Sequence, residues 1–143
     1  MPRFSEIEVG QDLPVVSLEV SQAVIDRNAV ASLDYNPVHL NVPWCRKAKV
    51  FGTELPVGHG MFTMSLMASV VTRWAYADGA QLRDMDAKFF KAVPAGDCLT
   101  CTGVVRELHP VGAGRNFAVV SLVAQNRQGE PVAIGTARVI LPD

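Results

Sequence analysis

An acid, an amide and an imidazole lie within six residues of the chain, as Asp34, Asn36 and His39. An imidazole can take up or release a proton near neutral pH, and a desolvated carboxyl group can donate one. The Asn36 amide can donate a hydrogen bond to a water molecule or orient a neighbouring group. Pro37 stiffens the segment and lowers the entropic cost of placing these groups. The stretch is therefore a candidate for acid–base chemistry.

The same stretch also fits an ordinary polar turn. Asp and Asn side chains bond readily to nearby backbone groups, so the pattern Asp-x-Asn-Pro is common in turns. His39 fits equally well as a partly buried strand residue. Spacing along the chain cannot show that side chains converge in space. On these residues alone, both interpretations stay open.

A second candidate is the segment Gly58-His59-Gly60, which precedes a strongly apolar stretch. Free N–H groups at the start of a helix favour negative charge on an oxygen, and Gly60 has no side chain to keep a ligand carbonyl away. A flexible helix entry is the alternative. Together with residues 34–39, the segment indicates a reaction that polarises a carbonyl while protons move nearby, such as enolate formation on a thioester.

Other site chemistries have little support in the sequence. Ser32 lies outside any Gly-x-Ser-x-Gly motif, and Cys45 has no acid–base partner near it in the chain. Cys98 and Cys101 have CxxC spacing, but they fall in an expected strand, where positions three apart point to opposite faces. We therefore expect three free thiols, no metal site and no cofactor.

The elements that must position these groups predict an α+β fold. The stretch from Gly58 to Gly79 predicts a long helix with its exit at Asp78-Gly79, apolar around most of its circumference and therefore buried. A short strand around residues 16–20 and a helix from Gln22 to Val30, capped by Ser21, are expected before the motif. The rest of the chain predicts four strands, Gln81–Phe90, Asp97–Leu108, Asn116–Asn126 and Pro131–Leu141. Hairpin connections between them indicate an antiparallel sheet with the helix lying on it.

The composition indicates one folded domain over residues 1–143. Nearly half of the residues are apolar and 19% are charged, which favours a packed core over disorder. The net charge is −1 and the longest basic run is Arg46-Lys47, so we do not expect nucleic acid as a partner. The apolar stretches are too short and too interrupted to cross a bilayer, and the start lacks a signal core. The expected setting is cytoplasmic, without a membrane partner.

Three segments resemble one known family. DYNPVH resembles the hydratase-2 motif of MaoC-like (R)-specific enoyl thioester hydratases, written Gly-Asp-x-Asn-Pro-x-His. VGHGMFTMSL resembles that family's His-Gly-Met helix start, and FKAVPAGDCL resembles its segment Phe-x-x-Pro-Val-x-x-Gly-Asp. The pattern GHGM-x-TM followed by VT-x-W is also similar to single-hot-dog dehydratase subunits of mycobacterial long-chain fatty acid elongation. The three segments occur in the family's order and cover most of the chain.

The resemblance implies a hot-dog fold, in which an antiparallel sheet wraps around a long central helix, and a dimer with the acyl chain near the subunit interface. It implies that Asp34 and His39 are the catalytic pair and that Asn36 holds the water or His39. The Gly60 N–H would bind the thioester oxygen, and Ser65 would lie near that carbonyl or near Asp34. The apolar helix would desolvate Asp34.

The activity implied is the reversible hydration of 2-enoyl thioesters, or the dehydration of (R)-3-hydroxyacyl thioesters, carried by CoA or acyl carrier protein. The implied assembly is a homodimer, or a heterodimer with a second hot-dog subunit. Two alternatives are a hot-dog acyl thioesterase and a non-catalytic subunit that shapes the acyl pocket of a heteromeric dehydratase.

Four further residues carry expectations. Leu33 stands where the family motif has glycine, which is expected to reshape the turn or the pocket. His59 is expected to support the turn through hydrogen bonds and not to act as a second base. Trp44 and Phe51 lie in an irregular region, residues 40–58, where we expect control of acyl length.

Overall fold

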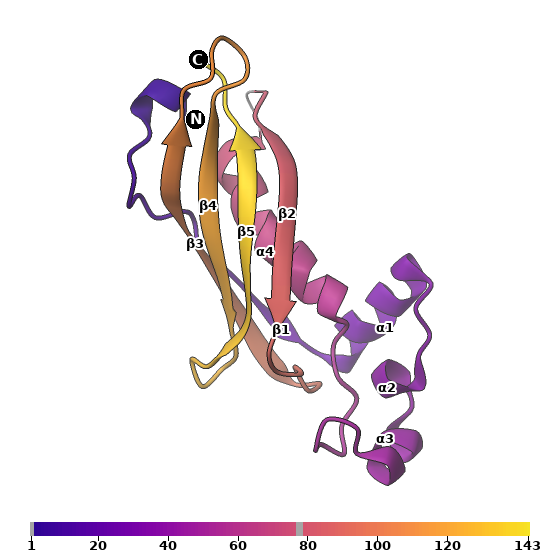
Figure 1. The fold of residues 1–143 in the computed structure, drawn as a ribbon. Helices are drawn as coiled ribbons and strands as arrows, with labels where there is room; N and C mark the ends of the chain where they lie inside the picture. Colours follow the sequence, from indigo (N-terminus) through magenta and orange to yellow (C-terminus); the bar gives the residue numbers. More distant parts are fainter. Residues whose placement is uncertain (1, 77–78) are drawn as a thin grey trace.

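The computed structural model describes residues 2–76 and 79–143, and it contains an antiparallel sheet with a long helix against one face (Figure 1). Across the sheet, the strand order is β1-β3-β4-β5-β2. The strands are β1 (Val16–Val20), β2 (Gln81–Phe89), β3 (Asp97–His109), β4 (Phe117–Gln125) and β5 (Pro131–Ile140). The four strands predicted after residue 80 are confirmed with their ends shifted by at most one residue. Turn residues mark these ends clearly, which makes them easy to locate in the sequence.

The long helix α4 (Gly60–Ala75) supplies one side of the hydrophobic core. Its buried residues include Met67, Val70 and Val71, and alternate residues of β4 are buried opposite them. The predicted α+β arrangement is therefore confirmed. The expectation that the helix is buried nearly all round is wrong for this chain, since Met61 is 64% exposed. The predicted exit at Asp78-Gly79 begins at a position outside the described residues.

Packing between the sheet and α4 is close enough to require glycine at one position. A Cβ atom added at Gly135 of β5 would overlap the carbonyl oxygen of Asp86 on β2 and would lie 3.1 Å from Cε of Met67. Real Cβ atoms do not approach a backbone oxygen so closely, so the neighbouring strand would have to move. Gly135 therefore allows β2, β5 and α4 to meet at this point.

Three short helices gather at one end of the molecule, beside the first turn of α4 (Figure 1). They are α1 (Gln22–Ser32), α2 (Pro37–Leu40) and α3 (Val42–Ala48), and a short 3-10 turn, η1 (Phe4–Glu6), precedes β1. The Ser21 side chain accepts a hydrogen bond from the Val24 N–H, as a cap should, and α1 runs two residues beyond its predicted end.

Across residues 2–76 and 79–143, the helices lack the length and apolar character that crossing a bilayer would require.

The helix α2 is absent from the sequence prediction, which allowed His39 only a turn or a strand. Pro37 occupies its first turn, where a missing N–H costs nothing, and the Asn36 side chain caps it by accepting from the Val38 N–H at 3.1 Å. The same two residues that indicate a turn therefore also start a helix. The single turn of α2 sets the direction in which His39 projects.

Candidate active site

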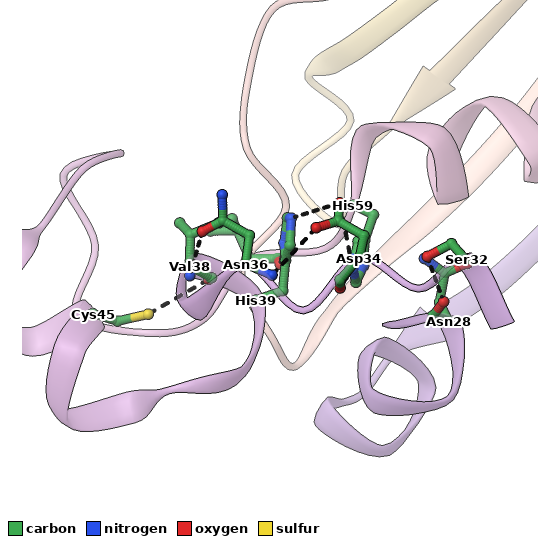
Figure 2. Close-up of polar contacts among 9 residues, drawn as sticks. Asn28, Ser32, Asp34, Asn36, Val38, His39, Cys45 and His59 are labelled. Carbon is green, nitrogen blue, oxygen red and sulfur yellow. Dashed lines mark hydrogen bonds and ion pairs between the residues drawn. The ribbon is translucent and has the colours of Figure 1, made fainter. Parts of the chain in front are cut away.

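Asp34, His39 and His59 meet where α2 approaches the start of α4 (Figure 2). His39 Nε2 lies 3.7 Å from Asp34 Oδ2, and His59 Nε2 lies 4.0 Å from the same oxygen. Asp34 and His59 are 25 residues apart, so the fold and not the local sequence brings them together. The two polar segments singled out in the sequence thus form one cluster.

The backbone around Asp34 takes an unusual conformation. Leu33 ends α1 in the left-handed region, with φ 58° and ψ 24°. Glycine is the usual residue at such a position, because a Cβ atom crowds the following carbonyl oxygen. Three residues after Leu33, the Asn36 N–H donates to Asp34 Oδ1 at 3.2 Å and closes a tight turn. The glycine of the family motif therefore corresponds to a real conformational demand, which Leu33 meets with strain.

The His39 ring is oriented by a backbone carbonyl. His39 Nδ1 lies 2.7 Å from the carbonyl oxygen of Val57, and the side chain is 12% exposed. Because a carbonyl oxygen only accepts, Nδ1 carries the proton in this contact and donates it. A neutral ring then presents the lone pair of Nε2 on its other side, which faces Asp34. This arrangement suits a general base.

His59 is the buried member of the cluster. Its residue exposure is 3%, and its ring stacks on that of His39 with centroids 3.7 Å apart and an interplanar angle of 22°. His59 Nε2 lies 3.1 Å from the carbonyl oxygen of Asp34, so it donates to that oxygen. The bond ties the residue before α4 to the turn that carries Asp34. The geometry fits the supporting role expected for His59.

The same three side chains could hold a metal ion, since each offers one ligand atom and these atoms lie within 4.8 Å of one another. A metal binds an imidazole nitrogen along its lone pair, in the plane of the ring. Stacked rings direct such lone pairs side by side, and His59 Nε2 is already committed to the Asp34 carbonyl. The arrangement therefore suits hydrogen bonding and proton transfer better than metal coordination.

A pocket with a volume of about 400 Å³ opens beside His39. Its walls combine α2, the first turn of α4 and the segment that follows β2. Apolar side chains dominate the lining, which consists of Asn36, Val38, His39, Phe51, Val57, Gly58, Gly60, Thr63, Phe89, Phe90, Lys91, Ala92, Val93 and Val132. Pockets of this size and character bind small apolar ligands with a few convergent polar groups. His39 and the start of α4 supply those polar groups here.

Gly60 stands at the first position of α4 and lines this pocket. N–H groups in the first turn of a helix lack intrahelical acceptors and carry the positive end of the helix dipole. Within residues 2–76 and 79–143, no acceptor bonds to the Gly60 N–H. A Cβ atom at this position would lie 3.6 Å from the Phe89 ring, in space that glycine leaves to the pocket. The N–H is therefore placed to bind an oxygen of a ligand.

The five predicted site residues do not all lie together. Asn36, His39 and Gly60 line the pocket, and Asp34 joins them through its contact with His39. Ser65 does not line it, because it lies on the exposed side of α4, where its hydroxyl donates to the Met61 carbonyl at 2.8 Å.

The structure bears on two expectations about the surroundings of the site. The Asp34 side chain is 50% exposed, so this chain by itself does not produce the expected desolvation. Of the two residues expected to control acyl length, Phe51 lines the pocket and Trp44 does not.

Thr63 is the pocket residue that sequence reasoning missed. It lies three residues after Gly60 and is 4% exposed. Residues three apart share one face of a helix, so its position relative to Gly60 was the available signal. The apolar neighbours of Thr63 obscure that signal, because they make the segment typical of a buried helix.

The three cysteines are free thiols, as expected. Cys101 is fully buried in β3, and burial raises the pKa of its thiol to about 12. Cys98 is only partly buried, with its sulfur 3.5 Å from the Ser17 hydroxyl oxygen. The two CxxC positions therefore have different environments, which fits the expected strand.

The chain is similar in sequence and in structure to known proteins. The family model described as "MaoC like domain" matches residues 5–127. The R-hydratase PhaJ1 from Pseudomonas aeruginosa is 23% identical, with a TM-score of 0.87 over 99% of this chain and 86% of that chain. The (R)-hydratase from A. caviae involved in PHA biosynthesis is 26% identical, with a TM-score of 0.82 over 95% of this chain and 98% of that chain.

A third similar structure is a complex. It is the C-terminally truncated HadBC (3R-hydroxyacyl-ACP dehydratase) complex from Mycobacterium tuberculosis, 21% identical, with a TM-score of 0.71. The match covers 92% of this chain and 96% of that chain. The agreement in architecture over nearly the whole chain confirms the α+β hot-dog fold.

Proposed function

Because the chain belongs to the MaoC-like domain family, we propose that it is a hydro-lyase that adds water to 2-enoyl thioesters and removes it from (R)-3-hydroxyacyl thioesters. One observation carries the proposal. The Val57 carbonyl orients His39 so that Nε2 faces Asp34 at 3.7 Å, beside a largely apolar pocket that begins at the N-terminus of α4. The 26% identical (R)-hydratase from A. caviae supports the same reaction class.

In the dehydration direction, His39 Nε2 removes a proton from C2 of the 3-hydroxyacyl thioester. The electron pair moves toward the thioester carbonyl, whose oxygen gains negative charge beside the Gly60 N–H and the helix dipole. The Val57 carbonyl accepts from Nδ1 and stabilises the imidazolium that forms. The C3–O bond then breaks, and the hydroxyl leaves as water with a proton delivered through Asp34.

Asp34 acts through water in this proposal, because half of its side-chain surface is exposed. Asn36 lines the pocket and uses its amide oxygen to cap α2, which leaves its NH₂ group to hold that water. Hydration is the reverse sequence, in which Asp34 takes a proton from the water that adds to C3 and the His39 imidazolium returns a proton to C2. Each group therefore moves the same proton in both directions.

The walls of the pocket favour an acyl group as the buried part of the substrate. Aliphatic and aromatic side chains, among them Val38, Val57 and Phe89, surround the site next to His39. Burial of acyl methylene groups against them contributes about 0.8 kcal/mol each. Phe51 closes one side from the irregular segment before α4, so it is the first residue to test for control of acyl length.

We also propose that residues 1–143 act as one domain in a dimer. The exposed part of α4 includes Met61, a large apolar side chain that a second subunit would cover. A similar structure, HadBC, is a complex of dehydratase chains, so both a homodimer and a heterodimer are candidate assemblies for this chain. Light scattering of the purified chain, alone and co-expressed with a second hot-dog chain, distinguishes the two.

The experiment that tests the reaction follows loss of the ultraviolet absorbance of a conjugated enoyl thioester. Short, long and branched 2-enoyl-CoA substrates are compared for wild type and Asp34→Asn. Wild type should hydrate at least one of them to the (R)-3-hydroxyacyl product, and Asp34→Asn should lower kcat/KM by about 10²–10⁴-fold.

Two outcomes would contradict the proposal. Release of free CoA from acyl-CoA without hydration would assign a thioesterase. A purified homodimer that is inactive on every enoyl thioester but activates a partner chain would assign a non-catalytic subunit. Chiral analysis of the product and a thiol assay separate these outcomes from simple hydration.

A further inference from the structure

The Thr63 side chain differs from the other hydroxyl side chains of α4. Ser65 donates to the Met61 carbonyl, Ser69 to the Leu66 carbonyl and Thr72 to the Ser69 carbonyl. A hydroxyl side chain in a helix usually donates its hydrogen bond in this way, to a backbone carbonyl of the preceding turn. In the part of the chain that the structure describes, the Thr63 hydroxyl makes no hydrogen bond, and it is the member of the set that lines the pocket.

The surroundings of this free hydroxyl make it informative. Thr63 is 4% exposed, and its hydroxyl oxygen is not among the fully enclosed polar atoms without a partner in the described residues, so it keeps an opening where the residue lines the pocket. A polar group in such a place gains free energy when it finds a partner. The helix backbone does not supply one. The pocket is the side from which a partner can come, so a ligand or a water molecule there would satisfy the hydroxyl.

The direction of helical side chains places this hydroxyl near the Gly60 N–H. The Cα–Cβ bonds of a helix tilt toward its N-terminus, so a side chain covers the turn that precedes its own Cα. For Thr63 that turn begins at Gly60, which lines the same pocket. A hydroxyl and a free N–H therefore face one part of the pocket from one helix turn.

We propose that the Thr63 hydroxyl is a second hydrogen-bond donor to the thioester carbonyl oxygen, next to the Gly60 N–H. This inference rests on the proposed hydro-lyase function and deepens it. The hydroxyl keeps its own proton throughout, and its hydrogen bond strengthens as negative charge develops on the oxygen. Its contribution is therefore larger in the transition state than in the bound substrate and acts mainly on kcat.

The test compares Thr63→Val, which keeps the shape and removes the donor, with Thr63→Ser, which keeps the donor. Loss of one oxyanion donor lowers kcat by about 10²–10³-fold, so Thr63→Val should lose that much with little change in KM. Thr63→Ser should recover most of the lost rate. Thr72→Val is the matched control, since its hydroxyl donates to the backbone outside the pocket and its removal should leave turnover unchanged.

A second measurement separates a polarising donor from a packing role. The infrared carbonyl stretch of a bound ¹³C-labelled acyl thioester should shift to lower frequency in wild type and in Thr63→Ser, and less in Thr63→Val. If wild type is active and the kcat of Thr63→Val lies within threefold of the wild-type value, the inference about Thr63 is overturned while the proposed reaction is not. Equal losses in Thr63→Val and Thr63→Ser would also overturn it, and an inactive wild type would overturn both proposals.

Discussion

The sheet with α4 and the segment that carries α1–α3 are built in different ways. Between the sheet and α4, large side chains such as Met67, Leu99 and Leu122 are at most 1% exposed. In the short helices only Ile25, Ala29 and Cys45 are buried, while Val30 is 63% exposed. Asp34 and His39 belong to this second region, yet the pocket they serve is completed by α4.

This contrast shows how the site is held. The short helices bury too little apolar surface to be fixed by hydrophobic packing alone. Their position depends on a few polar contacts with the entry to α4, chiefly His39 Nδ1 to the Val57 carbonyl and His59 Nε2 to the Asp34 carbonyl. Stability therefore resides mainly in the sheet and α4, and the proposed chemistry in the short helices. Each prediction below tests that separation.

The largest expected effect is on catalysis without a change in folding. Asp34→Asn and His39→Gln should each lower kcat/KM by about 10²–10⁴-fold, because each removes a proton-transfer group. Most of the stability comes from the core between the sheet and α4, which neither side chain joins, so the thermal unfolding midpoint should move by no more than about 3 °C. Scanning calorimetry beside the hydration assay measures both quantities. A variant whose unfolding midpoint falls as its activity falls would contradict the separation between the stabilising region and the catalytic region.

The next effect concerns two buried thiols, one in each region. Burial raises the pKa of Cys101 to about 12, so its thiolate fraction at pH 8 is about 1000-fold lower than for a thiol with the ordinary value of 9.0. Cys45 is also buried, but in α3, which should open locally more often than the sheet. Alkylation followed by peptide mass spectrometry should therefore modify Cys45 at least tenfold faster. Equal rates would contradict the difference in local stability.

The raised pKa of Cys101 also makes stability depend on pH. The folded state holds this proton more tightly than the unfolded state, so the stabilisation is fully present below about pH 9 and is lost as the pH rises toward 12. Denaturant titrations of wild type and Cys101→Ala over this range isolate the effect, since only wild type contains the group.

A smaller effect is expected from overfilling the close contact on β5. Gly135→Ala should lower the free energy of unfolding by about 2–3 kcal/mol, because the new Cβ meets the Asp86 carbonyl and Met67. Thr136→Ala, at the next and exposed residue, is the control and should change it by about 0.5 kcal/mol or less. Urea unfolding gives both values. If Gly135→Ala is as stable as its control, the contact between β5, β2 and α4 can adjust to an added Cβ atom, and the sheet is no more rigid than the short helices.

The smallest effect is a gain in stability at the start of the site. Leu33 is 76% exposed and left-handed, so its side chain contributes little packing and its backbone is strained. Leu33→Gly should raise the free energy of unfolding by about 0.5–1 kcal/mol, the strain relief exceeding the added entropy of the unfolded chain. Leu33→Ala keeps the strain and is the control. A stability loss in Leu33→Gly would show that the leucine side chain makes contacts that matter.

Features that depend on residues close together in the sequence could be predicted, and features that depend on tertiary packing could not. The strands of the second half and the Ser21 cap depend on neighbouring residues, and both were predictable. The helix α2 was missed because Asn36 and Pro37 can either form a turn or start a helix. Thr63 received no role from the sequence, and Ser65, expected near the thioester carbonyl or Asp34, lies on the exposed side of α4, since both positions depend on which face of α4 meets its surroundings.

The sequence by itself determined the fold class, the family and the segments that carry polar chemistry, because these depend on periodicity, turn residues and local motifs. Only the tertiary structure decided which groups meet. It placed the His59 ring on His39 and the Val57 carbonyl on His39 Nδ1. Those contacts join residues far apart in the chain, and their geometry follows from how α4 packs on the sheet, which no local pattern specifies.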